Sequence, residues 1–121
     1  MSYHTGSIAA VPTANRQQYL DHARECWSLF QRHGATRMVE TWGEDVPHGK
    51  RTDFHRATQA RDDEVIVFSW INWPDRATCD AAARVMEQDA GDTAQWEMPF
   101  DGKRMFWGGF VPLFDSASPS R

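Results

Sequence analysis

The chain has 121 residues, which is enough for one hydrophobic core and too few for two, so we expect a single folded domain. Its formal charge of −4 and its 13 scattered Lys and Arg residues offer no basic surface to a phosphate backbone, which argues against a nucleic-acid partner. No apolar run approaches the roughly 18 residues of a membrane span, and the first residues do not resemble an export signal, so no membrane partner is expected.

The first predicted element is a strand over residues 3–11. It ends at Pro12, because proline cannot continue the hydrogen-bond ladder of a strand. From Thr13 the apolar residues recur at helical spacing, which predicts a helix of about 20 residues. We expect Thr13 or Asn15 to cap its first turn and Gly34 to end it in a left-handed conformation.

The next segment predicts a second strand followed by a long connection. Residues 35–42 alternate, with Met38, Glu40 and Trp42 on one side, and Gly43 ends the strand. Residues 44–62 then show no sustained period, which predicts a loop longer than compact domains normally use.

The clearest strand signal covers residues 64–73. Apolar side chains point to both of its faces, so we expect a central strand that is covered on both sides. Pro74 ends it, and Asp75 is expected to cap a second helix that runs to about Gln88.

The end of the domain is predicted as one more strand and a tail. After a polar linker, the Asp101-Gly102 turn leads into a strand over residues 105–114. We expect residues 1–114 to form the domain and residues 115–121 to be a disordered tail.

The resulting order is β-α-β-β-α-β, which is the ferredoxin-like arrangement of the α+β class. In this fold an antiparallel sheet carries two helices on one face. The other face is left bare, yet its strands are apolar on both sides, so we expect a second copy of the chain to cover it in a homodimer.

The two cysteines indicate a reducing compartment. Cys26 and Cys79 form no CxxC motif, and each falls in a predicted helix. We therefore expect reduced thiols in a cytoplasmic protein.

Four motifs lie in order along the chain: GEDVPHGK at 43–50, VFSW at 67–70, MPFDGKRM at 98–105 and GGF at 108–110. Together they resemble the hallmarks of the YbaA-like family, a bacterial domain of unknown function. The resemblance covers nearly the whole chain. It implies the dimeric α/β barrel arrangement of ferredoxin-like subunits, and it implies no particular activity.

The long loop gathers groups that can act as a general base or bind a divalent metal, namely Glu44, Asp45, His48, Asp53 and His55. Their spacing matches no metal motif, so we expect no metal, and a solvated loop with incidental histidines is the simpler interpretation. If the loop is instead a flap over a pocket, His55 is its candidate inward-facing group.

Two further patterns allow a structural and a functional interpretation. Lys103 and Arg104 beside the Asp101-Gly102 turn can form an anion clasp, or the segment can be plain turn chemistry with Arg104 paired to an acid. The six tryptophans, among them Trp42, Trp70, Trp73, Trp96 and Trp107, can line a pocket for an aromatic small molecule, or they can fill the core and an interface.

These patterns lead to a functional hypothesis with two alternatives. The first hypothesis is a homodimeric domain that binds or senses a small molecule in a pocket between the sheet and the long loop. The predicted ligand-binding residues are Trp42, His55, Trp70, Arg104 and Trp107. The second is a dimeric-barrel enzyme without a cofactor, which transfers a proton or oxygenates a small aromatic compound with His55 or Asp45 as base. The third is a structural dimer without a ligand. No nucleotide-binding motif is present, and no cofactor is expected.

Overall fold

The computed structural model describes residues 2–88 and 98–117. Its strands are β1 (Tyr3–Pro12), β2 (Arg37–Glu40), β3 (Glu64–Trp73) and β4 (Phe106–Phe110). Its helices are α1 (Arg16–Arg32), α2 (Phe54–Thr58) and α3 (Arg76–Gln88), with the 3₁₀ turns η1 (Thr13–Asn15) and η2 (Gly102–Arg104).

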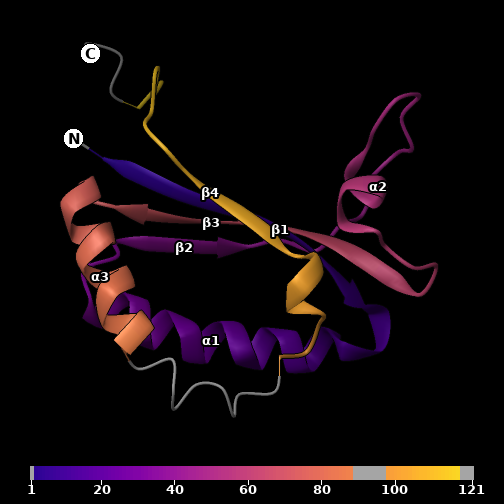
Figure 1. Ribbon diagram of the computed structural model, residues 1–121, viewed down its shortest axis with the longest axis horizontal. Helices are drawn as coiled ribbons and strands as arrows, with labels where there is room; N and C mark the ends of the chain where they lie inside the picture. The colour runs from indigo at the N-terminus through magenta and orange to yellow at the C-terminus, as the bar shows by residue number, and fades with distance from the viewer. Residues whose placement is uncertain (1, 89–97, 118–121) are drawn as a thin grey trace.

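The strands form one four-stranded sheet in the order β2-β3-β1-β4, and every neighbouring pair is antiparallel. Helices α1 and α3 lie on one side of this sheet, whereas α2 lies beyond its other side (Figure 1). This arrangement confirms the predicted α+β, ferredoxin-like fold.

The core lies between the sheet and the two long helices. Trp73 of β3 packs with Cys79 and Ala82 of α3 and with Ala35, and its ring meets the Phe30 ring edge-on at 6.2 Å. Since side chains alternate along a strand, the odd-numbered residues of β3 face the helices and the even-numbered residues face away from them.

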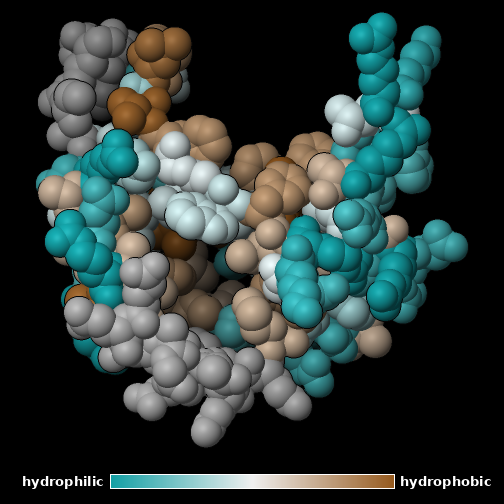
Figure 2. All heavy atoms as spheres, in the orientation of Figure 1, coloured by the Kyte–Doolittle hydropathy of each residue, from teal (hydrophilic) through white to brown (hydrophobic). Residues whose placement is uncertain are grey.

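The face of the sheet opposite α1 and α3 is apolar, and we call the part of it that α2 does not cover the helix-free face. Phe68, Phe106 and Phe110 point to this side and are 47%, 42% and 60% exposed. Trp70 lies beside Phe68 on the same face and is only half-buried, although a central strand was expected to bury it. Figure 2 shows apolar residues on the sheet between two projections. One projection is the chain beyond β4 and the other is the segment that carries α2 (Figure 1).

One detail of α1 differs from the prediction and another agrees with it. Neither Thr13 nor Asn15 caps the helix, because their side chains bond elsewhere, to the carbonyl oxygens of Asp63 at 2.9 Å and of Pro99 at 2.9 Å. Gly34 does follow the helix in a left-handed conformation, with a φ of 105°.

The long loop contains a helix that the pattern did not predict. Helix α2 is capped by Asp53, whose carboxylate accepts a hydrogen bond from the Arg56 backbone at 2.7 Å. Thr58 at its end is fully buried. Five residues with one buried side chain leave no helical period to detect.

The remaining predictions concern the lengths of β2 and β4, the linker before η2 and the C-terminal tail. Strand β2 is shorter than the expected 35–42, but hydrogen bonds from Thr36, Thr41 and Gly43 continue its pairing with β3. Strand β4 ends at Phe110, before Pro112. The linker around Gly91 and residues 118–121 lie outside the described residues.

Candidate functional site

The predicted aromatic residues lie on different sides of the sheet. Trp42 lies on the helix side, with its ring 6.5 Å from the Tyr19 ring and the Arg16 guanidinium 5.5 Å over it. Trp107 also faces the helix side, because it pairs with Ser7, whereas Trp70 faces away from the helices. One subunit therefore does not bring these rings together, and Trp96 lies outside the described residues.

His55 interacts within its own loop. Its Nε2 lies 2.8 Å from the Val46 carbonyl oxygen, and its ring stacks on His48 with 4.2 Å between centroids. His48 in turn lies 3.6 Å from the Asp53 carboxylate, whose pKa is lowered by the Arg56 backbone N–H. Asp45 is exposed, and the roles of His55 and Asp45 as bases stay predictions. Within the described residues, no three potential metal ligands come together.

Arg104 is held by acidic side chains. Its guanidinium forms a bidentate ion pair with Glu64 of β3, at 2.7 and 2.6 Å, and it also donates to Asp101 at 3.1 Å and to the Gln59 carbonyl oxygen at 2.9 Å. The ion pair lowers the pKa of Glu64 and raises that of Arg104. An acid partner therefore occupies the position that an anionic ligand would take.

A row of polar and small side chains crosses the helix side of the sheet. Cross-strand pairs join Glu40 of β2 to Ser69 of β3, Ser69 to Ser7 of β1, and Ser7 to Trp107 of β4. The row runs from the half-buried Glu40 to Trp107 at the edge, a residue that is 71% exposed. It interrupts a face that otherwise carries mainly apolar side chains.

Glu40 is hydrogen-bonded at the inner end of this row. Its Oε1 accepts a hydrogen bond from the Tyr19 hydroxyl at 2.5 Å and a short one from the Ser69 hydroxyl. No described residue donates to its other oxygen, Oε2. Since no fully buried side-chain oxygen or nitrogen in residues 2–88 and 98–117 lacks a partner, Oε2 is not completely buried.

The ionisable neighbours of Glu40 on α1 stay protonated. Burial, and then the Glu40 carboxylate, raises the pKa of Tyr19 above its ordinary range. The same two causes, in the same order, raise the pKa of Cys26 to about 11. The Cys26 sulfur lies 3.4 Å from Nε2 of His22, one turn earlier on the helix.

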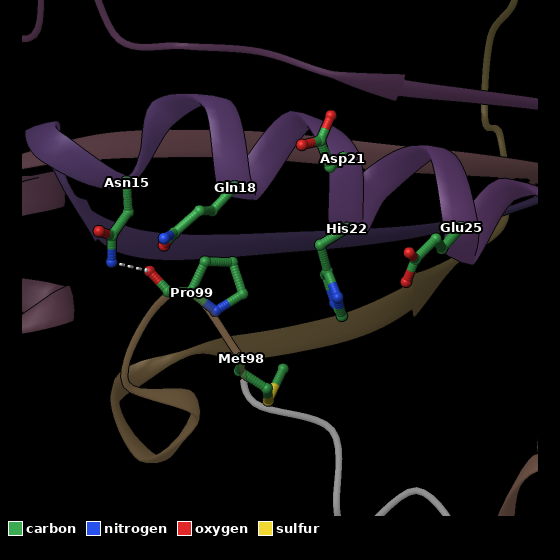
Figure 3. A pocket seen from close by; sticks show the side chains of 7 residues that line it. All are labelled: Asn15, Gln18, Asp21, His22, Glu25, Met98 and Pro99. Atoms are coloured by element: carbon green, nitrogen blue, oxygen red, sulfur yellow. Dashed lines mark hydrogen bonds between the residues drawn. The ribbon is translucent and has the colours of Figure 1, made fainter.

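A cavity of about 650 Å³ lies beside these residues, between α1 and the segment before η2. Asn15 bonds the Pro99 carbonyl across one end of it (Figure 3). The next residue, Phe100, packs its ring 5.7 Å from the Tyr19 ring. The lining residues are Asn15, Gln18, Asp21, His22, Glu25, Met98 and Pro99.

The sequence contained part of this site. Glu40 was placed on the same side of its strand as Met38 and Trp42, a carboxylate between two apolar residues. Ser69 is likewise the one hydroxyl in the apolar run of β3. Neither residue was singled out, because their partner Tyr19 comes from a helix whose rotation over the sheet the pattern did not specify.

Comparisons with known proteins place the chain among relatives without an assigned role. The family model "protein of unknown function (DUF1428)" matches residues 2–102. The uncharacterized protein YbaA of Escherichia coli K12 is 44% identical over 116 residues, which cover 95% of this chain and 99% of that protein. YbaA of Shigella flexneri gives the same values.

Among solved structures, the chain is similar to a dimeric ferredoxin-like protein from an uncultured marine organism. The TM-score is 0.58 at 9% sequence identity, over 90% of this chain and 91% of that one. At this identity the similarity concerns the fold. No helix among the described residues is both long and apolar enough to cross a membrane.

Proposed function

Because the chain belongs to the DUF1428 family of YbaA-like proteins, whose function is unknown, we propose its function from its own geometry: it is a homodimeric domain that binds a small molecule. The two subunits join through the helix-free faces of their sheets. The observation that carries this proposal is the group of exposed rings on that face, Phe68, Phe106 and Phe110. The dimeric state of the ferredoxin-like structural neighbour supports it.

The helix-free face suits a second copy of the chain. Exposed aromatic rings on a central surface favour burial against a partner, and a two-fold axis lets the same patch serve both subunits. The projections on either side of the sheet leave its middle open to such a partner (Figure 2). We expect a total buried area above about 1,000 Å², the size of a specific interface.

The small-molecule part of the proposal has two supports. The cavity of about 650 Å³ beside α1 falls within the size range of ligand sites. Near it, the Tyr19 ring of α1 packs 5.7 Å from the ring of Phe100, the residue that follows the lining Pro99, and such rings suit a small organic molecule. The free thiols Cys26 and Cys79 support a cytoplasmic setting.

Sedimentation equilibrium at micromolar concentration tests the dimer. We expect a species of twice 13.9 kDa for the wild type and a single 13.9 kDa species for Phe68→Asp, because a carboxylate would be buried without a partner. Leu20→Asp is the matched control, since Leu20 is 41% exposed but lies on α1, away from the face. A wild type that stays at 13.9 kDa up to about 100 µM, far above the affinity range of specific dimers, refutes the proposal.

A further inference from the structure

We propose that the hollow between the sheet and α1 binds a small organic amine, whose protonated nitrogen donates to the free oxygen of Glu40. This inference rests on the proposed small-molecule function and gives it a place and a ligand class. The site lies on the helix side of the sheet, so it is complete within one subunit and separate from the proposed dimer face.

The first support is the position of Glu40 in the helix-facing layer. A carboxylate in such a layer costs free energy that an apolar side chain would not, unless its oxygens are bonded. The fold does not need a charge at this place, because neighbouring positions on the same side, such as Val67 and Ile71, are apolar. Departures of this kind from the folding pattern are expected where a protein binds or reacts with something.

The second support is the way in which the carboxylate is held. Tyr19 and Ser69 both donate to Oε1, which fixes the orientation of the group and leaves Oε2 as the acceptor without a partner among the described residues. An ionised carboxylate can only accept hydrogen bonds, so its ligand must present a donor. A protonated amine supplies the donor together with the opposite charge, which makes the bond a strong one.

The third support is the space around the acceptor. Ser69 and Ser7 are the small residues of the row that leads from Glu40 to the sheet edge. Trp107 at the outer end is 71% exposed. Figure 2 shows a hollow below β4 of Figure 1, on the side of the sheet that faces α1.

Charge and aromatic rings define the ligand class further. Tyr19 and Cys26 remain neutral at pH 7, so the negative charge that a ligand meets here comes from the Glu40 carboxylate and not from them. Two acidic residues, Asp21 and Glu25, line the cavity beside α1. Their charges make the electrostatic potential there more negative, which favours the entry of a cation. Arg16, the cation on this side, is stacked over Trp42. The rings around Tyr19 favour an amine with an apolar or aromatic body.

Calorimetric titration with three probes of similar shape tests the proposal. Phenethylamine presents the ammonium group, 2-phenylethanol is its neutral counterpart and phenylacetate is anionic. We expect the wild type to bind the amine about tenfold or more tightly than the alcohol, the ratio that one charge-assisted hydrogen bond provides, and not to bind the anion.

Two variants at the site and one on the exposed loop make the result specific. Glu40→Gln keeps the shape of the side chain and should weaken amine binding about 10-fold to 100-fold. Tyr19→Phe removes one of the two hydrogen bonds that orient the carboxylate and should weaken amine binding by less than Glu40→Gln does, whereas the exposed Glu44→Gln should bind as the wild type does. Thermal melts of each variant show that it is folded.

The outcomes separate this inference from the proposed function. If Phe68→Asp is monomeric and still binds phenethylamine, the site is independent of the dimer, as proposed. If the alcohol binds as well as the amine and Glu40→Gln changes neither, a small-molecule site exists but our assignment of its ligand is wrong. If phenethylamine does not bind at about 10 mM, weaker than any specific ligand, the amine site is refuted whatever the state of association.

Discussion

Replacing Arg104 by leucine should destabilise the domain strongly, although Arg104 is a charged residue next to a turn. Its side chain is 12% exposed and that of its partner Glu64 is 3% exposed. The substitution removes both hydrogen bonds of the bidentate pair and leaves the Glu64 carboxylate buried without a counter-charge. It also releases the contacts that tie η2 to Asp101 and to the Gln59 carbonyl oxygen.

The size of the effect follows from the burial of the pair. Removing one partner of a buried ion pair costs about 3–5 kcal/mol. We expect the lower value, about 3 kcal/mol, because the backbone N–H of Arg61 still donates to Glu64 at 2.7 Å. For a domain of this length the loss lowers the melting temperature by about 10 °C.

Urea unfolding at pH 7 measures the change, and two further variants interpret it. Arg76→Leu is the control, because the Arg76–Asp80 pair is 73% and 47% exposed and should contribute less than about 1 kcal/mol. Adding Glu64→Gln to Arg104→Leu should restore more than half of the lost stability, since the unpaired charge is then gone. A loss below about 1 kcal/mol for Arg104→Leu, or a further loss in the double variant, would refute the reasoning.

The same pair predicts a pH dependence. Arg104 lowers the native pKa of Glu64, so the pair contributes stability above the unfolded pKa of about 4.3 and loses it as the pH falls through the lower native value. Arg104→Leu lacks this contribution at every pH. Its deficit relative to the wild type should therefore shrink between about pH 5 and pH 3.

Three other predictions concern single residues. Gly34→Ala should cost about 1–3 kcal/mol, because φ is 105° and the new Cβ would lie 2.5 Å from the Thr78 methyl group; an unchanged urea midpoint would contradict this. Cys26, with a pKa of about 11 against an ordinary 9.0, should react with Ellman's reagent at pH 8 about 10-fold more slowly than an ordinary thiol, because a roughly 100-fold lower thiolate fraction is partly offset by a more nucleophilic thiolate, and labelling at the ordinary rate would show an accessible thiolate. Trp70→Ala should lower stability by about 3 kcal/mol where the dimer forms and by less in dilute solution, since its ring is half-buried in one subunit; a concentration-independent loss would argue against an interface there.

Much of the fold could be predicted because its signals are local. The bounds of β3 agree with the predicted 64–73 at both ends, since a continuous apolar run meets Pro74 directly. The cap of α3 was also predicted, and the Asp75 carboxylate does accept from the Thr78 backbone at 2.7 Å. Helix α2 was missed because contacts with β1, distant in sequence, compensate for its short length.

The candidate site was harder to predict because its parts come from distant segments. Glu40 lies 21 residues from Tyr19 and 29 from Ser69. Alternation along β2 predicted the side to which Glu40 points, but not the residue of α1 that lies over it. In the sequence, the loop histidines stand out because imidazole groups are chemically active. In the structure, the candidate site is built on the carboxylate of Glu40, whose Oε2 has no partner among the described residues and which lies on the side of the sheet that faces α1.

Strand β3 has consequences for how the sequence can change over evolution. Phe68 and Trp70 point to the proposed subunit interface, and Ser69 between them points to Glu40. Three consecutive residues are thus constrained by two unrelated surfaces. Insertion of one residue before them would turn each side chain to the opposite face of the sheet. We expect substitutions to accumulate more slowly in this strand than in the exposed face of α3, and adaptation to a new ligand to proceed through α1 and the strand edges.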